Sequence, residues 1–251
     1  MTKRLLHSLM TAATAIIVMV VAVSCSSESY TPGDGAYSLL RCDFAEARTN
    51  SDAALSSFVT DEGRSWTVSG AAKVSWMTTP DSVYRAMVYY DVPGDDASVG
   101  TDASAGSGSV ALSTTLRSVV QVYTLTPRRS YKEGDVKTDP LSLDAVWLSE
   151  NGKYVNLTLT LKTGTTDGES SLQSIGTLLR GITVNGDGSV SADVVLCHDQ
   201  ADVPQYYSAR VYASIPTAAL TVSGDGSSVA DSVSIEVNTY KGMVTRTVKL
   251  H

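Results

Sequence analysis

YVNLTLTLKT, residues 154–163, is the stretch that decides the fold class. Apolar residues stand at every second position, namely Val155, Leu157, Leu159 and Leu161, and the residues between them are polar or charged. Successive side chains of a strand point to opposite faces, so a period of two predicts a strand with one buried and one solvated face. Because no long stretch with helical spacing of apolar residues follows residue 24, we expect an all-β protein.

The second half of the chain repeats this pattern. Further strand-like runs occupy residues 141–149, 190–196, 210–215, 233–237 and 243–250. Asn151-Gly152 favours the two-residue turn of a tight hairpin, and the Gly-Asp-Gly segments at 186–188 and 224–226 indicate further turns. Short strands separated by such turns predict a C-terminal antiparallel β-sandwich over residues 131–251.

The first half of the chain predicts a smaller β-domain. Strand-like runs occupy residues 36–46, 55–60, 65–68, 83–92 and 116–125, and the core candidates of the first run are Leu39, Leu40 and Phe44. A Gly-, Ser- and Asp-rich loop over 94–109, expected to be mobile, precedes the last run. Five strands arranged in this way predict an OB-like barrel over residues 36–130, although the pattern alone leaves a sandwich open. The polar segment 127–138 is the best domain boundary.

The N-terminal segment has the layout of a bacterial lipoprotein signal. Lys3 and Arg4 precede an apolar run that ends at Val23, and Cys25 follows small residues and opens a polar stretch. We expect a signal peptide over residues 1–24, lipidation of the Cys25 thiol, and a lipidated tether over residues 25–35. The expected location is the cell envelope, with a lipid anchor in the outer membrane. The sequence leaves open whether the protein lies on the cell surface or on the periplasmic face.

Two other interpretations of this segment remain. A transmembrane anchor needs about 20 apolar residues, whereas the strongly apolar part here is confined to Ala15–Val23. An ordinary signal peptide would leave Cys25 as a chance residue, and Ala22 stands where lipoprotein signals more often carry leucine.

The charge of the chain argues against nucleic acid as a partner. Removal of residues 1–24 takes away two cations, Lys3 and Arg4, and no acid, so the formal net charge changes from −7 to −9. Nucleic-acid binding needs clustered cations. The single short basic run, Arg128-Arg129 with Lys132 nearby, is typical of a solvated turn.

The sequence predicts neither a metal site nor a cofactor. Cys42 and Cys197 lie in different predicted domains, and we expect two small buried apolar residues rather than a disulfide. Isolated cysteines at this spacing do not make a zinc site. Asp187 and Asp225, in the Gly-Asp-Gly turns, lack the further ligands of an EF-hand loop.

The chain offers little material for catalysis. It has no G-x-S-x-G motif, and only His198 and His251 remain after cleavage of the signal. Asp95-Asp96 could serve glycoside hydrolysis, but a Gly- and Ser-rich loop holds a fixed carboxylate spacing poorly. We therefore predict no catalytic residue.

One polar and aromatic segment between two strands is the main candidate for ligand binding. An imidazole, a carboxylate, an amide and two phenols could hold a sugar or a peptide, from His198, Asp199, Gln200, Tyr206 and Tyr207. The alternative is structural: the polar groups hydrogen-bond to nearby backbone while one tyrosine packs against the loop. We favour the structural interpretation.

The three tryptophans raise the same question. Trp147 stands inside an alternating run and is expected in the core. Trp76 precedes a turn and is the better candidate for an exposed ligand platform.

Several short motifs together resemble the NigD-like lipoproteins, which are exported lipoproteins of Gram-negative gut and oral anaerobes. The motifs are Lys137-Thr138-Asp139-Pro140, Ala145-Val146-Trp147, Tyr154-Val155-Asn156-Leu157, His198-Asp199-Gln200, Tyr206-Tyr207 and Ser214-Ile215-Pro216, with Phe58-Thr60-Asp61-Gly63 and the Tyr84–Tyr90 run in the first half. The resemblance covers most of the chain after the signal and is most specific from Asp139 to Pro216. It departs at Asp199, where family members often have asparagine.

The resemblance implies an N-terminal OB-type barrel and a C-terminal β-sandwich, and it supplies no catalytic residue. The family name comes from a gene in a bacteriocin cluster, which suggests an immunity or accessory role. Our first hypothesis is a non-enzymatic, membrane-anchored protein that binds a protein, peptide or glycan. The alternatives are a bacteriocin immunity protein and a glycan-acting enzyme with two facing carboxylates.

Overall fold

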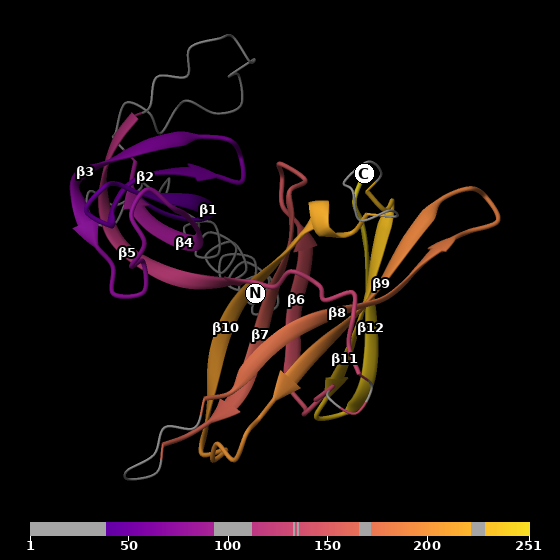
Figure 1. Cartoon of the computed structure of the whole chain (residues 1–251). Helices are drawn as coiled ribbons and strands as arrows, with labels where there is room; N and C mark the ends of the chain where they lie inside the picture. Colours follow the sequence, from indigo (N-terminus) through magenta and orange to yellow (C-terminus); the bar gives the residue numbers. More distant parts are fainter. Residues whose placement is uncertain (1–38, 93–111, 133, 135, 166–171, 222–228) are drawn as a thin grey trace, which may run out of the picture. The chain divides into compact units, whose positions relative to one another are not determined.

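A computed structural model of the chain describes residues 39–92, 112–132, 134, 136–165, 172–221 and 229–251 (Figure 1). Within these ranges the elements are strands and one 3-10 turn, η3 (Thr217–Ala219), which confirms the predicted all-β class. The described part contains no helix with the length and apolar character needed to cross a membrane. The expectations for Cys25, the segments 1–24 and 25–35, the 94–109 loop with Asp95-Asp96, and Asp225 lie outside the described residues.

The first five strands close into a ring. They are β1 (Leu40–Thr49), β2 (Ala54–Thr60), β3 (Ser65–Lys73), β4 (Val83–Asp91) and β5 (Leu112–Thr124). β1 lies between β2 and β4, and β5 pairs with β4 on one side and with β3 on the other. The β3–β5 pairing is parallel, and the order β1-β2-β3-β5-β4 confirms the predicted OB-like barrel.

Three aromatic rings fill the barrel. Phe58 and Trp66 each lie against Tyr90, with ring centroids 5.0 and 5.1 Å apart, and all three side chains are buried. β1 adds Ala45 and Ala47 to this core, because its odd-numbered residues face inward there. Small residues on β1 leave room for the large rings of β2, β3 and β4.

The core expected on the first strand is therefore wrong in its residues. Leu39 and Leu40 are 40% and 36% exposed, because they lie just before β1 and at its first position, outside the packed cluster of the barrel. Phe44 is half-buried and is absent from the barrel core. Its ring lies instead against Trp147 and Tyr212 of the second half.

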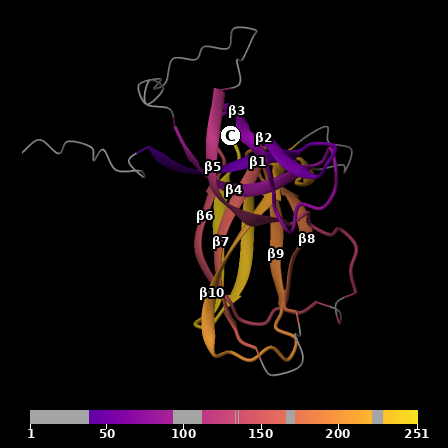
Figure 2. The same ribbon diagram turned by 90° about the vertical axis from the view of Figure 1, so that its left-hand side faces the viewer.

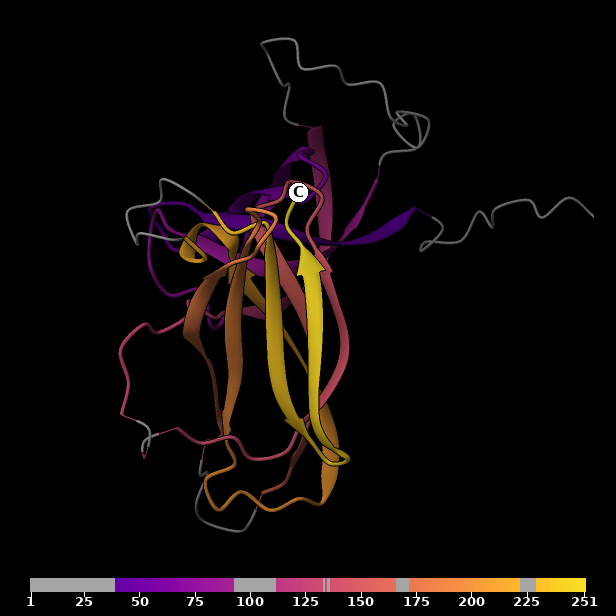
Figure 3. The ribbon, with the colours of Figure 1, turned by 90° about the vertical axis from the view of Figure 1, so that its right-hand side faces the viewer.

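Seven further strands form two facing layers. They are β6 (Ser142–Leu148), β7 (Tyr154–Thr163), β8 (Ser174–Val184), β9 (Val190–Asp199), β10 (Tyr207–Pro216), β11 (Ser232–Thr239) and β12 (Gly242–Lys249). One layer continues from β5 as β10-β7-β6, and the other has the order β12-β11-β9-β8 (Figures 1 and 3). This confirms the predicted sandwich, in which the β9–β11 and β5–β10 pairings are parallel.

The alternating stretch at 154–163 forms β7 and packs as predicted. Val155, Leu157, Leu159 and Leu161 are buried in the sandwich core together with residues of β9 and β11 such as Ile235. β8 is the strand that the sequence analysis missed. Its alternation is interrupted by two glycines and a charged residue, Gly176, Gly181 and Arg180, which weaken a period-two signal.

The core assignment of Trp147 is also wrong. Its side chain is 37% exposed, because its neighbours Val146 and Leu148 face the sandwich core and alternation along β6 turns Trp147 to the opposite face. The indole lies edge-on to Phe44, with the centroids 5.4 Å apart.

The segment between barrel and sandwich, residues 125–139, forms what we call the strap. It first pairs with the outer edge of β8, where the Arg128 amide donates to the Thr177 carbonyl at 2.9 Å. It then pairs with β9, where the His198 amide donates to the Lys137 carbonyl at 3.0 Å. Figure 2 shows it as the pink loop beside β8 and below it.

The strap also covers apolar residues on the outer face of β8 and β9. Val136 packs against a small buried cluster of Leu178, Val195 and Cys197. Residues Leu39–His251 form one compact unit, and the division into domains at 130/131 stays a prediction.

Candidate functional site

Arg85 is at the centre of a buried polar network between barrel and sandwich. Its Nη1 and Nη2 donate to Asp61 Oδ1 and Oδ2 at 2.6 and 2.5 Å. Nε donates to Ser214 Oγ at 3.2 Å, and Nη2 also donates to Asn156 Oδ1 at 3.0 Å. The guanidinium carbon lies 4.2 Å from the ring centroid of Tyr154, and only 1% of the Arg85 side chain is exposed.

A second set of contacts surrounds this network. Lys153 Nζ lies 3.2 Å from Glu46 Oε1, and the Tyr154 hydroxyl donates to the same carboxylate at 3.0 Å. The ring of Phe44 contacts Trp147 and Tyr212 edge-on, at centroid distances of 5.4 and 5.9 Å. The barrel face of β1 and β4 is thus joined to β6, β7 and β10 by charge, hydrogen bonds and aromatic packing.

This network explains several residues of the family-like motifs. Asp61, Asn156 and Ser214 belong to motifs far apart in the sequence, and all three bind one guanidinium. A buried charge with all these partners holds two packed parts in register, and breaking such a pair is costly. We assign this cluster to architecture.

His198 belongs to a second structural network. Its side chain is 1% exposed, with Nδ1 3.1 Å from the Asp139 carbonyl oxygen and Nε2 3.0 Å from Gln173 Oε1. The Gln200 backbone N–H donates to Asp139 Oδ2 at 2.8 Å. These bonds fasten the end of the strap to β9, and the structural interpretation favoured for His198 and Gln200 stays a prediction.

The remaining candidate residues do not gather around His198. Tyr206 and Tyr207 are 73% and 56% exposed, and Asp199 is half-buried and accepts a hydrogen bond from the Ala201 amide at 2.9 Å. Trp76 is also half-buried and lies edge-on to Tyr84, 5.8 Å between centroids, against the barrel core. Binding roles stay predictions for all six candidates, namely Trp76, His198, Asp199, Gln200, Tyr206 and Tyr207.

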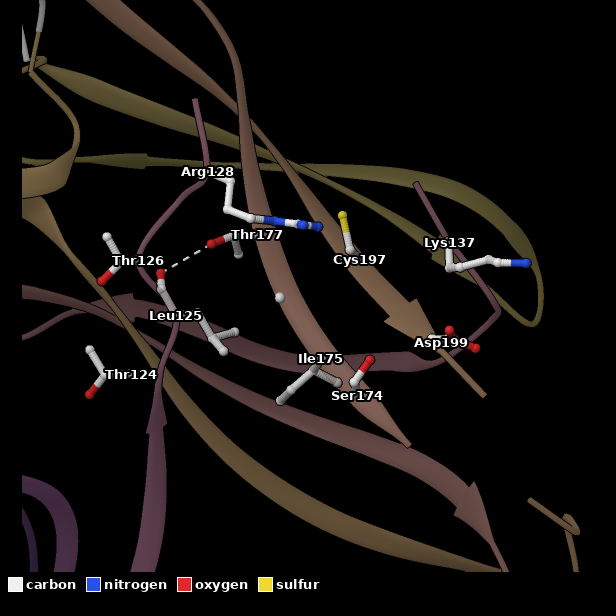
Figure 4. A pocket seen from close by; sticks show the side chains of 11 residues that line it. Thr124, Leu125, Thr126, Arg128, Lys137, Ser174, Ile175, Thr177, Cys197 and Asp199 are labelled. Carbon is white, nitrogen blue, oxygen red and sulfur yellow. Dashed lines mark hydrogen bonds between the residues drawn. The ribbon is translucent and has the colours of Figure 1, made fainter. Parts of the chain in front are cut away.

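A pocket lies where the strap leaves the first layer and joins the second (Figure 4). Its volume is about 480 Å³, within the range of small-molecule sites. The strap side contributes Thr124, Leu125, Thr126, Arg128 and Lys137, and β8 and β9 contribute Ser174, Ile175, Gly176, Thr177, Cys197 and Asp199. The Thr177 hydroxyl donates to the Leu125 carbonyl at 3.0 Å and holds one wall in place.

The floor of this strap pocket follows from the strand register. Ser174 pairs with Asp199 and Gly176 with Cys197, so these side chains share the outer face of the β8–β9 ladder. Nothing lies within 4 Å of the position that a Cβ on Gly176 would occupy. The glycine therefore leaves the floor of the pocket open.

Positive charge lines the strap side of the pocket. Arg128 and Lys137 are exposed, and neither has an ion pair within the described ranges. Burial raises the pKa of the Cys197 thiol, and the nearby charge of Arg128 opposes this rise. Figure 4 shows Arg128 on one side of Cys197, with Lys137 and Asp199 on the other. The expectation of a merely solvated turn at Arg128 overlooked this position.

Cys197 and His198 do not form a catalytic dyad. They are neighbours in the chain, but alternation along β9 places the thiol on the outer face and the imidazole on the inner face. A raised thiol pKa also disfavours the thiolate that nucleophilic catalysis needs. The described residues contain no group of three or more histidine, cysteine, aspartate or glutamate side chains placed to hold a metal ion.

The two cysteines within the described ranges, Cys42 and Cys197, are both free, and they differ in burial. Cys197 is buried as expected, whereas Cys42 is exposed, and the prediction that both are buried is wrong for Cys42. On β1 Cys42 pairs with Tyr89 of β4, outside the packed interior of the barrel.

Solved structures with a similar fold come from species of Bacteroides and Parabacteroides. A NigD-like immunity protein from Bacteroides caccae matches with a TM-score of 0.55 at 19% identity, over 82% of this chain and 91% of that one. A protein from Parabacteroides distasonis, provisionally described as toxin-related, matches with a TM-score of 0.52 at 15% identity, over 84% and 92%. A provisionally described lipoprotein from Bacteroides fragilis matches with a TM-score of 0.55 at 10% identity, over 84% and 98%.

These matches confirm the resemblance to NigD-like proteins at the level of the fold, over most of the chain. None of the three is named as an enzyme. No protein-family model and no curated protein matches the sequence.

Proposed function

We propose that this chain is a non-enzymatic, lipid-anchored accessory protein of the cell envelope that binds a partner. The observation that carries the proposal is the strap pocket: a concave site with two exposed cations, the Asp199 carboxylate and several hydroxyls, in which the described residues place no thiol or histidine for catalysis. Preorganised polar groups around an open cavity fit binding, and chemistry would need an activated nucleophile or an acid–base pair.

Support for anchoring comes from the layout around Cys25 and from the B. fragilis relative described as a lipoprotein. Replacement of Cys25 by alanine is expected to release the protein from membranes and to abolish labelling by a radioactive fatty acid. Labelling that persists in Cys25→Ala would contradict lipidation at this residue.

The binding role is tested by capture from envelope extracts with the full chain as bait. We expect enrichment of a protein or glycan that the Arg128→Gln variant captures less. An extract from which the chain enriches nothing would contradict the proposal.

A second candidate function is immunity against a bacteriocin, and the names of the B. caccae and P. distasonis relatives favour it. Deletion of the gene is then expected to sensitise the cell to the toxin of the same gene neighbourhood. Unchanged sensitivity would exclude immunity and leave the binding role standing.

A further inference from the structure

We propose that the strap pocket binds the free carboxyl end of a short extended peptide. The inference rests on the proposed binding role and names the chemistry of the ligand. Its three supports are an open sheet edge, a chain segment that blocks this edge on one side, and a guanidinium at the block.

The open edge belongs to β8, which is the last strand of its layer among the described residues. The strap already uses this edge at one position, because Arg128 bridges to Leu178 in parallel orientation, with the Leu179 amide donating to the Arg128 carbonyl at 2.9 Å. The pocket adjoins the preceding positions of the same edge, Ser174–Gly176, whereas Thr177 is already bonded to Arg128 and Leu125 of the strap. Extended peptides commonly add to exposed sheet edges through main-chain hydrogen bonds.

The strap limits how such a peptide can lie. From Thr177 onward the β8 edge is occupied by the backbone of Arg128, so an added parallel segment must end there. A parallel peptide ends with its carboxylate toward Arg128. An antiparallel peptide would place its ammonium group there, against the like charge of the guanidinium. The strap therefore selects the carboxyl end.

The charges of the pocket agree with this orientation. A guanidinium binds a carboxylate through two parallel hydrogen bonds, and Arg128 has no ion pair within the described ranges. Lys137 adds a second cation, and the hydroxyls of Thr124, Thr126 and Ser174 can bond to peptide groups. The pocket also has one carboxylate in its lining, Asp199. In a chain with a formal charge of −7, two cations without an ion pair in the described ranges form a local exception at this pocket.

A substitution at Gly176 can fill the pocket with a side chain while Arg128 and Lys137 stay unchanged. Its backbone does not adopt the left-handed conformation that only glycine favours, and a Cβ there meets nothing within 4 Å. Gly176→Phe should therefore place a ring in the pocket without straining β8. Gly181→Phe, also on β8 with open space at the Cβ and outside the pocket, is the matched control.

The test is a titration of the full chain in detergent with trialanine, trialanine amide and acetate, followed by tryptophan fluorescence or calorimetry. We expect trialanine to bind at least about tenfold more tightly than the amide, because a hydrogen bond to a charged group is lost in the amide. We expect Arg128→Gln and Gly176→Phe to lose this binding and Gly181→Phe to keep it. Thermal unfolding of all variants verifies that they fold.

Three outcomes would overturn the proposal: no binding of trialanine, equal binding of the amide, or binding that survives both Arg128→Gln and Gly176→Phe. Acetate that binds as tightly as trialanine would also overturn it, because the ligand would then be an anion alone. The capture experiment above stays independent. A partner captured while trialanine does not bind refutes only the carboxyl-end inference, and a bait that captures nothing refutes the binding role itself.

Discussion

Two arginines show how this fold uses the same side chain in opposite ways. Arg85, between barrel and sandwich, is buried and holds Asp61, Asn156 and Ser214. Arg128, on the strap, is exposed and has no ion pair in the part of the chain that the structure describes. A guanidinium whose donors are satisfied internally serves architecture, whereas one that faces an open pocket is available to a ligand.

The largest expected effect breaks the junction. Arg85→Met removes the partner of a buried carboxylate, and such losses cost about 3–5 kcal/mol of unfolding free energy. Urea unfolding of the variant measures this cost. The matched control is Arg128→Met, which should stay within about 0.5 kcal/mol of the parent because its side chain is exposed. Equal destabilisation by the two variants would contradict the distinction drawn between them.

His198→Ala is expected to have the next largest effect. The change leaves Gln173 Oε1 and the Asp139 carbonyl without their ring partner, and an unsatisfied buried polar group costs about 1–3 kcal/mol. Thermal unfolding monitored by circular dichroism gives the shift. Tyr206→Ala, at a side chain that is 73% exposed, should hardly change stability. A His198→Ala variant as stable as the parent would reopen a functional role for the imidazole.

Alkali should weaken the barrel. Burial and the hydrogen bond to Asp43 raise the pKa of Tyr90, and the neighbouring Cys42 side chain raises the pKa of Tyr89 to about 12. Both folded-state pKa values lie above the unfolded value of 10.0. The contribution of the protonated tyrosines to the free energy of unfolding is therefore present below pH 10 and is lost as the pH rises toward 12. Tyr90→Phe should cost about 1 kcal/mol at neutral pH through the lost hydrogen bond and should flatten the alkaline loss. Urea unfolding from pH 8 to 12 tests both points, and an unchanged alkaline profile in Tyr90→Phe would refute the second.

The smallest effect concerns an exposed ion pair on the second layer. Arg180 Nη2 lies 2.8 Å from Glu236 Oε1 and lowers the pKa of Glu236. A lowered folded-state pKa means that the contribution is present above the unfolded value of 4.5 and disappears as the pH falls. Exposed pairs contribute about 0.2–1 kcal/mol. A double-mutant cycle with Glu236→Gln and Arg180→Gln measures this coupling, and a value near that of Arg85–Asp61 would contradict the difference between buried and exposed pairs.

Local pattern predicted most of the strands, because alternation is a property of a few neighbouring residues. It failed at β8, where Gly176 and Gly181 interrupt the period, and at Trp147, where the pattern does not say which face of the strand is buried. The first core was misassigned for a related reason. Leu40 is more apolar than Ala45, but the large rings of Phe58, Trp66 and Tyr90 leave only alanine-sized space on β1.

The candidate site was predicted only in fragments. His198 and Asp199 were singled out for their chemistry. The His198 ring contacts the Asp139 carbonyl oxygen, whereas Asp199 lines a pocket together with residues of the strap. Arg128 was read as part of a solvated turn, because its position opposite Gly176 and Cys197 depends on a pairing with β8 across some fifty residues. Burial raises the pKa of Cys197, and Val136 of the strap packs against the cluster that contains this thiol.

By itself the sequence determined that the chain is all-β, that its second half is a layered sheet structure, and that its N-terminus has the layout of a lipoprotein signal. These properties are carried by neighbouring residues: alternation, turn dipeptides, and a short apolar run before Cys25. Only the tertiary structure decided that Arg85 joins the two halves, that the His198 ring is buried between Asp139 and Gln173, and that the strap forms a pocket with Arg128 and Lys137 in its lining. Each of these depends on which residues meet across strand pairings, because burial and charge compensation arise from contacts between segments far apart in the chain.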